Sequence, residues 1–157
     1  MNDFDKDTHI DHILHNAGTV NDKNALRLLA QTAANVMNIK EQDILARLSQ
    51  RKTIESAAIG GGVAIPNIQM NNIDSPLTVL MHMKMPVTFE PTPDDEPVDI
   101  ACLLISPKSD GPIHLRRLSR LARMLSDPVM RRKIRESNNA QELQLAVSNN
   151  EGWLVAA

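Results

Sequence analysis

The sequence predicts one α/β domain, because patterns typical of helices and of strands are interleaved along the chain. Apolar residues recur at helical spacing over 24–37 and again over 113–125. In contrast, every second residue of 78–85 is apolar on one face, and 98–106 is an almost unbroken apolar run. The 157 residues are enough for one buried core, and no internal repeat or long linker divides them.

The first part of the chain is expected to form a polar, mobile tail over residues 1–10, followed by the domain over 11–157. The first helix is expected over Asn24–Met37, where the apolar residues lie three or four positions apart. Asn38, followed three residues later by Glu41, predicts the start of a second helix, because this spacing is typical of a capping box.

Three strands are expected in the middle of the chain. Val63–Ile65 follows a glycine-rich turn and predicts a short strand. The alternation over 78–85 predicts a half-buried strand, with a core-facing set made of Val79, Met81, Met83 and Met85. The apolar run over 98–106 predicts a central strand covered on both faces, which also makes Cys102 a buried, unreactive thiol.

Helices are expected to dominate the last third of the chain. The clearest lies over Ile113–Leu125, with a buried stripe of Leu115, Leu118, Leu121, Ala122 and Leu125. Asp127 followed by Pro128 predicts the start of the next helix, because the fixed φ of proline suits the first helical position. A final helix is expected over about 140–148.

Composition excludes several classes of protein. The formal charge of −2 provides no general attraction to nucleic acid or to an anionic membrane. The N-terminus lacks the apolar segment of a signal peptide, and no apolar run approaches the length of about 20 residues that spans a bilayer. A single cysteine rules out an internal disulfide and fits a reducing compartment, so we expect a cytoplasmic protein without membrane insertion.

The segment Ile59–Asn67, with the sequence IGGGVAIPN, is the most informative part of the chain. Three glycines lead into a short apolar strand, and Pro66 ends that strand and presents the side chain of Asn67. The glycines alone are weak support for a phosphate-binding loop, because no Gly-Lys-Ser/Thr follows them and the next element is a strand. Taken alone, Asn67 is best interpreted as an ordinary turn residue.

In its wider context this segment resembles the enzyme IIA domains of the bacterial phosphotransferase system, of the fructose/mannitol and nitrogen-regulatory type. The similarity spans about 11–152 and includes three further segments: Leu48–Arg51, Phe89 with Asp94–Val98, and His114-Leu115. The resemblance implies a single-domain three-layer sandwich with a mixed β-sheet flanked by helices. It also implies protein partners, either phosphotransferase components or regulated transporters and kinases, and no cofactor.

The resemblance implies a site at which the central chemistry is missing. In this family the proline is followed by a histidine that carries a phosphoryl group, whereas this chain has Asn67 at that position. Imidazole has a lone pair that can attack phosphorus at neutral pH, but the amide nitrogen of asparagine is neither basic nor nucleophilic. By the same resemblance His114 is the second histidine of the site, while Arg51 and Ser56 belong to the phosphoryl-binding side.

Neighbouring positions also depart from the family pattern. Lys52 stands where a glutamate is usual, Ala57 where a threonine is usual, and Gly61 where Asn or Asp is common. These changes favour a regulatory protein that binds partners without being phosphorylated, with homo-oligomer formation left open. The alternative is an active phosphocarrier that uses His114 as the phosphoryl acceptor. Because His114 opens a helix, the macrodipole is expected to keep its ring neutral and able to bond the carbonyl of Asn67.

Two other groups of side chains could in principle bind a ligand. Arginines crowd 116–123 and 131–135, and they predict either a nucleic-acid surface or, preferably, a solvated helix face paired with acidic loops. The spacing of His9, His12 and His15 would place three imidazoles on one face of a helix, but no fixed fourth ligand accompanies them. We therefore predict no metal site there.

Overall fold

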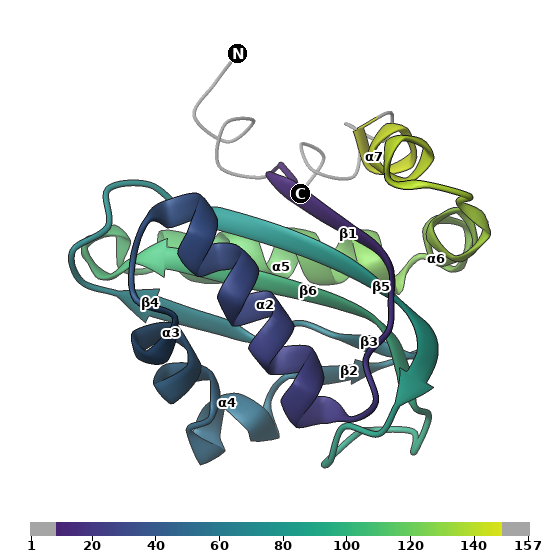
Figure 1. Ribbon diagram of the computed structural model, residues 1–157, viewed down its shortest axis with the longest axis horizontal. Coiled ribbons are helices and arrows are strands. Elements are labelled where there is room, and N and C mark those ends of the chain that lie inside the picture. Colours follow the sequence, from purple (N-terminus) through teal and green to yellow (C-terminus); the bar gives the residue numbers. More distant parts are fainter. Residues whose placement is uncertain (1–8, 149–157) are drawn as a thin grey trace.

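The computed structural model describes residues 9–148, in which one mixed sheet lies between two layers of helices (Figure 1). The strands run in the order β1-β5-β6-β3-β2, and β4 also pairs with β6. The β5–β6 and β2–β3 pairs are antiparallel, whereas β1–β5, β3–β6 and β4–β6 are parallel. The strands are β1 His12–Ala17, β2 Ala58–Gly60, β3 Val63–Ala64, β4 Asn67–Met70, β5 Leu77–Val87 and β6 Val98–Pro107.

The helices divide between the two faces of the sheet (Figure 1). One face is covered by α2 and α3, with the short α4 after them, and the opposite face by α5, α6 and α7. The helices are α2 Asp22–Met37, α3 Glu41–Leu48, α4 Arg51–Glu55, α5 Ile113–Ser126, α6 Pro128–Glu136 and α7 Ala140–Ser148, and a 3₁₀ turn η1 covers Lys108–Asp110. This arrangement confirms the expected three-layer α/β sandwich.

Strand β6 joins the two cores, as its continuous apolar sequence predicts. Because side chains alternate along a strand, Ala101, Leu103 and Ile105 pack under α2 and α3. Ile100, Cys102 and Leu104 pack on the opposite side under α5–α7. Burial raises the pKa of the Cys102 thiol to about 12, which confirms the predicted unreactive cysteine.

Strand β5 is more deeply buried than its alternating pattern predicts. Val79, Met81 and Met83 face the first core, but Leu80 is also fully buried in the second. The half-buried interpretation was therefore wrong for 78–81, because a second layer of helices covers the face assumed to be solvated. It was wrong in the other direction for Met85, which is 64% exposed in the stretch between His82 and Val87 where the register with β6 shifts.

Helix boundaries follow the capping side chains, with one correction. The side chain of Asp127 accepts a hydrogen bond from Met130 N, and Pro128 occupies the first turn of α6, as predicted. Asn38, however, does not start α3. It ends α2 in the left-handed conformation (φ 56°), which asparagine tolerates better than most residues, and Glu41 begins α3 after Lys40.

The N-terminal histidines do not lie on a helix. His12 and His15 belong to β1, where side chains three apart point to opposite faces of the sheet, so the proposed helical arrangement was wrong. Within 9–148 no group of His, Cys, Asp and Glu side chains gathers in a metal-binding arrangement. Most of the tail expected over 1–10 lies outside the described residues, although Ile10 is buried in the second core.

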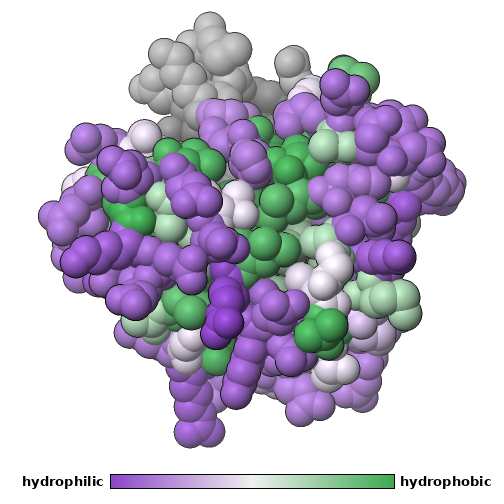
Figure 2. All heavy atoms as spheres, in the orientation of Figure 1, coloured by the Kyte–Doolittle hydropathy of each residue, from purple (hydrophilic) through white to green (hydrophobic). Residues whose placement is uncertain are grey.

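The helices and the face shown in Figure 2 agree with the mainly polar composition of the sequence. No helix in the described part of the chain is long and apolar enough to cross a bilayer. Figure 2 shows that the face carrying α2 is mainly hydrophilic, with smaller apolar areas between the polar side chains.

The glycine turn between β2 and β3 is locked by side chains from distant parts of the chain. Gly60, Gly61 and Gly62 all have positive φ, at 95°, 67° and 78°. Gly61 N donates to Asp94 Oδ2 at 2.8 Å, which lowers the pKa of that carboxyl, and Gly61 O accepts from Arg135 Nη2 at 2.7 Å. The turn therefore requires glycine both for its backbone conformation and for the close approach of its neighbours.

A glycine substitution tests this requirement. A Cβ at position 62 would lie 2.5 Å from Arg135 Nη2 and 3.1 Å from Asp99 Oδ1, so Gly62→Ala should disturb their ion pair and strain the backbone. We expect urea denaturation to give a loss of roughly 2 kcal/mol in the free energy of unfolding. Gly18→Ala is the matched control, because no atom lies within 4 Å of the added Cβ. Equal stabilities for the two variants would contradict the proposed lock.

Candidate functional site

Asn67 is positioned by the break between two short strands. Pro66 separates β3 from β4, and Asn67 is the first residue of β4 rather than the residue that ends a strand, as the sequence suggested. Both strands remain parallel to β6, with Asn67 opposite Leu104 and with Leu104 N donating to Pro66 O at 3.1 Å. The proline therefore interrupts the strand, while the central strand holds both halves in register.

His114 reaches Asn67 from the connection that follows β6. The chain leaves β6, turns through η1, and starts α5 with Ile113, so that His114 lies in the first turn of the helix. His114 Nε2 is 3.0 Å from Asn67 Oδ1, and Asn67 Nδ2 donates to Ile65 O at 2.9 Å. The structure thus brings together two residues that are 47 positions apart in the sequence.

The other ring nitrogen of His114 is also occupied. Its Nδ1 is 2.8 Å from Ser106 Oγ, and Arg117 Nη1 donates to the same hydroxyl at 3.0 Å. Arg117 Nη1 also forms an ion pair with Asp110 Oδ2 at 2.7 Å. His114, Ser106 and Arg117 are 5%, 0% and 3% exposed, so most of this network is shielded from solvent.

Ser106, Asp110 and Arg117 were not among the site residues predicted from the sequence. Arg117 was assigned to a solvated helix face, yet it lies three residues after His114, and residues three apart share a face of a helix. A polar residue at the end of an apolar strand, directly before a helix that carries a histidine, was the available signal for Ser106. The predicted buried stripe was correspondingly rotated, since Leu115 is 63% exposed while Arg117 and Arg120 are buried.

The surroundings of His114 favour its neutral form. Burial, followed by the positive charge of Arg117, lowers the pKa of His114. The expected neutrality therefore agrees with the structure, but burial is its main cause, whereas the sequence argument relied on the helix dipole. A neutral ring carries one N–H and one lone pair, and both are engaged within the network.

Arg51 and Ser56 do not join this network in the structure. The side chain of Arg51 is 92% exposed and pairs with Glu55, one turn further along α4, at 2.8 Å. Ser56 Oγ donates to the carbonyls of Lys52 and Thr53 behind it. Within 9–148 no hydrogen bond links either residue to Asn67 or His114, so their place in a shared site stays a prediction.

Several arginines are committed to local ion pairs. Arg135 holds Asp99 through Nε at 2.9 Å and through Nη2 at 2.8 Å, and Arg117 holds Asp110. The guanidinium of Arg131 lies where a side chain at position 61 would project. Arg135 is therefore paired with an acidic residue as predicted, Arg117 is paired inside the protein, and the absence of a nucleic-acid surface stays a prediction.

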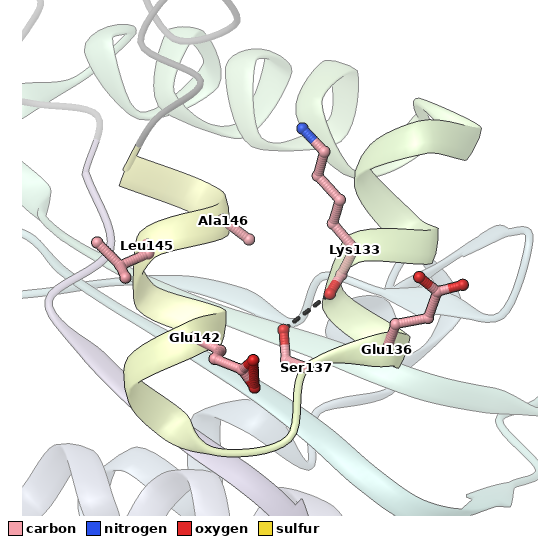
Figure 3. Close-up of a pocket in the computed structure, with 6 residues that line it drawn as sticks. All are labelled: Lys133, Glu136, Ser137, Glu142, Leu145 and Ala146. Atoms are coloured by element: carbon pink, nitrogen blue, oxygen red, sulfur yellow. Dashed lines mark hydrogen bonds between the residues drawn. The ribbon is translucent and has the colours of Figure 1, made fainter.

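An open groove of about 420 Å³ lies between α6 and α7, on different elements from Asn67 and His114 (Figure 3). Lys133, Glu136, Ser137, Glu142, Leu145 and Ala146 line it. Ser137 Oγ donates to Lys133 O at 2.7 Å, and the Lys133 side chain extends away from Glu142 (Figure 3). The groove has no histidine or cysteine nucleophile in its lining, so we assign it no chemistry.

Comparison with known proteins agrees with this architecture. The family model for the phosphoenolpyruvate-dependent sugar phosphotransferase system, EIIA 2, matches residues 8–150. The chain is 35% identical over 121 residues to a nitrogen regulatory protein of Bradyrhizobium diazoefficiens, covering 77% of this chain and 78% of that protein.

Solved structures show the same fold. Nitrogen regulatory protein IIA-Ntr from Neisseria meningitidis superposes with a TM-score of 0.76 at 23% identity, over 87% of this chain and 92% of that one. Enzyme IIA mannitol from Escherichia coli, in its complex with phosphorylated enzyme IIB mannitol, gives a TM-score of 0.69 at 12% identity, over 88% and 94% of the two chains. The chain therefore belongs to the EIIA 2 family of the phosphotransferase system, and its relatives include nitrogen regulatory proteins.

Proposed function

We propose that this protein is a nitrogen-regulatory-type IIA protein that acts by binding partner proteins and is not phosphorylated. In this proposal Asn67 occupies the position of the phosphoacceptor histidine of the family. A phosphohistidine would add roughly two negative charges and three acceptor oxygens to the surface. Without it, the protein offers its partners a single binding state. The site then presents permanently the shape and polarity of an unphosphorylated protein.

The observation that carries this proposal is the closed Asn67–His114 pair. A phosphoryl acceptor needs a nitrogen lone pair that can reach an incoming phosphorus atom. The amide nitrogen of Asn67 has no such lone pair, and Nδ1 of His114 faces the buried hydroxyl of Ser106. Neither residue offers a free nucleophile.

The alternative, an active phosphocarrier that uses His114, is disfavoured by the same geometry. Phosphorylation at Nε2 would displace the amide of Asn67, and phosphorylation at Nδ1 would displace Ser106 from the buried end of the network. Both would place a dianion in a site that is 5% exposed at His114, which is costly without new cationic partners. Arg117 is already paired with Asp110.

The remaining parts of the proposal concern surface, partner and compartment. The partner-binding surface surrounds Asn67 and includes Leu115, a 63% exposed apolar side chain beside His114. Arg51 and Ser56 form the neighbouring phosphoryl-binding side inherited from the family, although both now bond within and around α4. Phosphotransferase components or regulated transporters and kinases in the cytoplasm are the proposed partners, and sedimentation of the purified chain tests homo-oligomer formation.

Phosphorylation by phosphoenolpyruvate and the general phosphotransferase components tests the function. We expect no acid-labile phosphoryl adduct on the wild-type protein by mass spectrometry, because no accessible nucleophile exists at position 67. Asn67→His should gain such an adduct at position 67, since it restores the lone pair on the same backbone. His12→Gln serves as a control, because it removes an exposed histidine far from the pair in sequence.

The site of any adduct decides between the two functions. A phosphoryl group on His114 of the wild-type protein, lost in His114→Gln, would overturn the regulatory proposal in favour of the phosphocarrier. Failure of Asn67→His to be phosphorylated, in a folded protein, would show that the departures at Lys52 and Ala57 also block the chemistry.

Stability against pH tests the neutrality of His114. Its folded pKa is lowered, so the unfolded chain binds more protons near pH 6.5, and the free energy of unfolding should fall as pH decreases through about 6.5. His82, whose pKa is also lowered, mainly by burial, acts in the same direction. We expect His114→Gln to show a shallower loss between about pH 7 and 5 in urea titrations. A slope as steep as that of His12→Gln would contradict the assignment.

A further inference from the structure

A chain of hydrogen bonds runs in one direction through the candidate site. Arg117 Nη1 lies 3.0 Å from Ser106 Oγ, Ser106 Oγ lies 2.8 Å from His114 Nδ1, and His114 Nε2 lies 3.0 Å from Asn67 Oδ1. The chain ends where Asn67 Nδ2 donates to Ile65 O at 2.9 Å. Each hydrogen bond limits where the proton of the next one can lie, so the donor and the acceptor of every bond can be assigned in turn.

The proton of Ser106 has one acceptor in the described part of the chain. A guanidinium has only donors, so Ser106 Oγ accepts from Arg117 Nη1 with one of its two lone pairs. If Oγ also accepted from His114 Nδ1, its own proton would be buried without a partner, because Ser106 is 0% exposed and Nδ1 at 2.8 Å is the acceptor within reach. Nδ1 therefore carries the lone pair, and the single proton of the neutral ring lies on Nε2.

The orientation of the Asn67 side-chain amide follows from the proton on Nε2 of His114. A proton on Nε2 needs an acceptor, which is Asn67 Oδ1, and this leaves Nδ2 to donate to Ile65 O. The flipped amide would place its NH₂ group against an N–H and its oxygen against a carbonyl oxygen. Both contacts would be repulsive, so the two ends of the amide fix the same orientation.

Asp110 compensates the charge of Arg117, the buried residue at which the chain of hydrogen bonds starts. The side chain of Arg117 is 4% exposed, and a guanidinium so deeply buried requires a compensating charge. Asp110, 25% exposed, supplies that charge at 2.7 Å. Arg117 and Asp110 are thus the charged groups that stand behind His114, one from α5 and one from the turn that precedes it.

We propose that Asp110, Arg117 and Ser106 form a positioning relay that holds His114 as the tautomer protonated on Nε2 and thereby orients the amide of Asn67. The relay does not rest on the proposed function, because it follows from donor and acceptor geometry whether or not the protein is phosphorylated. Its three members are positioning residues, since none of them contacts Asn67 in the hydrogen-bond chain.

Nitrogen-15 NMR of the full-length protein tests the relay directly, because ring nitrogens with and without a proton have separate chemical shifts. Near neutral pH the wild type should show His114 with Nε2 protonated and Nδ1 unprotonated. Arg117→Met removes the positive charge that stands on the Nδ1 side of the ring and opposes a proton there, so it should raise the share of the Nδ1-protonated tautomer and raise the His114 pKa. Arg116→Met is the matched control, because it removes the same charge from an exposed position on the same helix and should change neither.

Asp110→Asn distinguishes an effect of the relay on His114 from an effect of general loss of packing. This variant keeps the donor and the charge of Arg117 but removes the compensating carboxylate, so the tautomer should persist and the His114 pKa should fall further. General loosening would expose the ring and raise its pKa in both variants. Three results would each overturn the proposal: a wild-type ring protonated on Nδ1, the same tautomer populations in the wild type and in Arg117→Met, or a His114 pKa raised by Asp110→Asn. The wild-type measurement stands even if Arg117→Met fails to fold.

Discussion

The pairing of β4 with β6 is the constraint on which the candidate site depends. Pro66 cannot donate a backbone hydrogen bond, and the strand is interrupted there, yet parallel pairing resumes at Asn67 opposite Leu104. The same register places Gln69 opposite Ser106, and β6 then leads through one short turn into α5. Asn67, Ser106 and His114 are therefore brought together by one strand and the helix that follows it.

Burial then decides the chemistry that these residues can perform. A histidine on an exposed turn would exchange its proton freely with water, whereas His114 is 5% exposed and has both nitrogens engaged. Desolvation and the charge of Arg117 act in the same direction and keep the ring neutral. The site is consequently one in which both ring nitrogens of His114 are engaged and largely shielded from solvent.

The arginines show how one residue type serves separate purposes in this fold. Arg135 holds the glycine turn through Asp99 and the carbonyl of Gly61, at the opposite end of β3 from the break at Pro66. Arg117 is buried behind His114 and paired with Asp110. In both places a planar guanidinium can reach two acceptors at once, which a lysine does less well. These two arginines therefore have structural roles.

The sequence by itself determined the α/β class, the buried β6, the start of α6 and the pairing of Asn67 with His114. The first three features depend on local patterns, namely apolar runs and capping residues. The pairing of Asn67 with His114, which are 47 positions apart, was expected only through the resemblance to a family. Only the tertiary structure decided that Asn38 ends a helix, that both faces of β5 near Leu80 are covered, and that Arg117 lies inside the protein. The burial of Leu80 and of Arg117 depends on which element packs against a given face, and that is decided by residues distant in the sequence. The role of Asn38 depends on its left-handed backbone conformation, which the order of the residues does not specify.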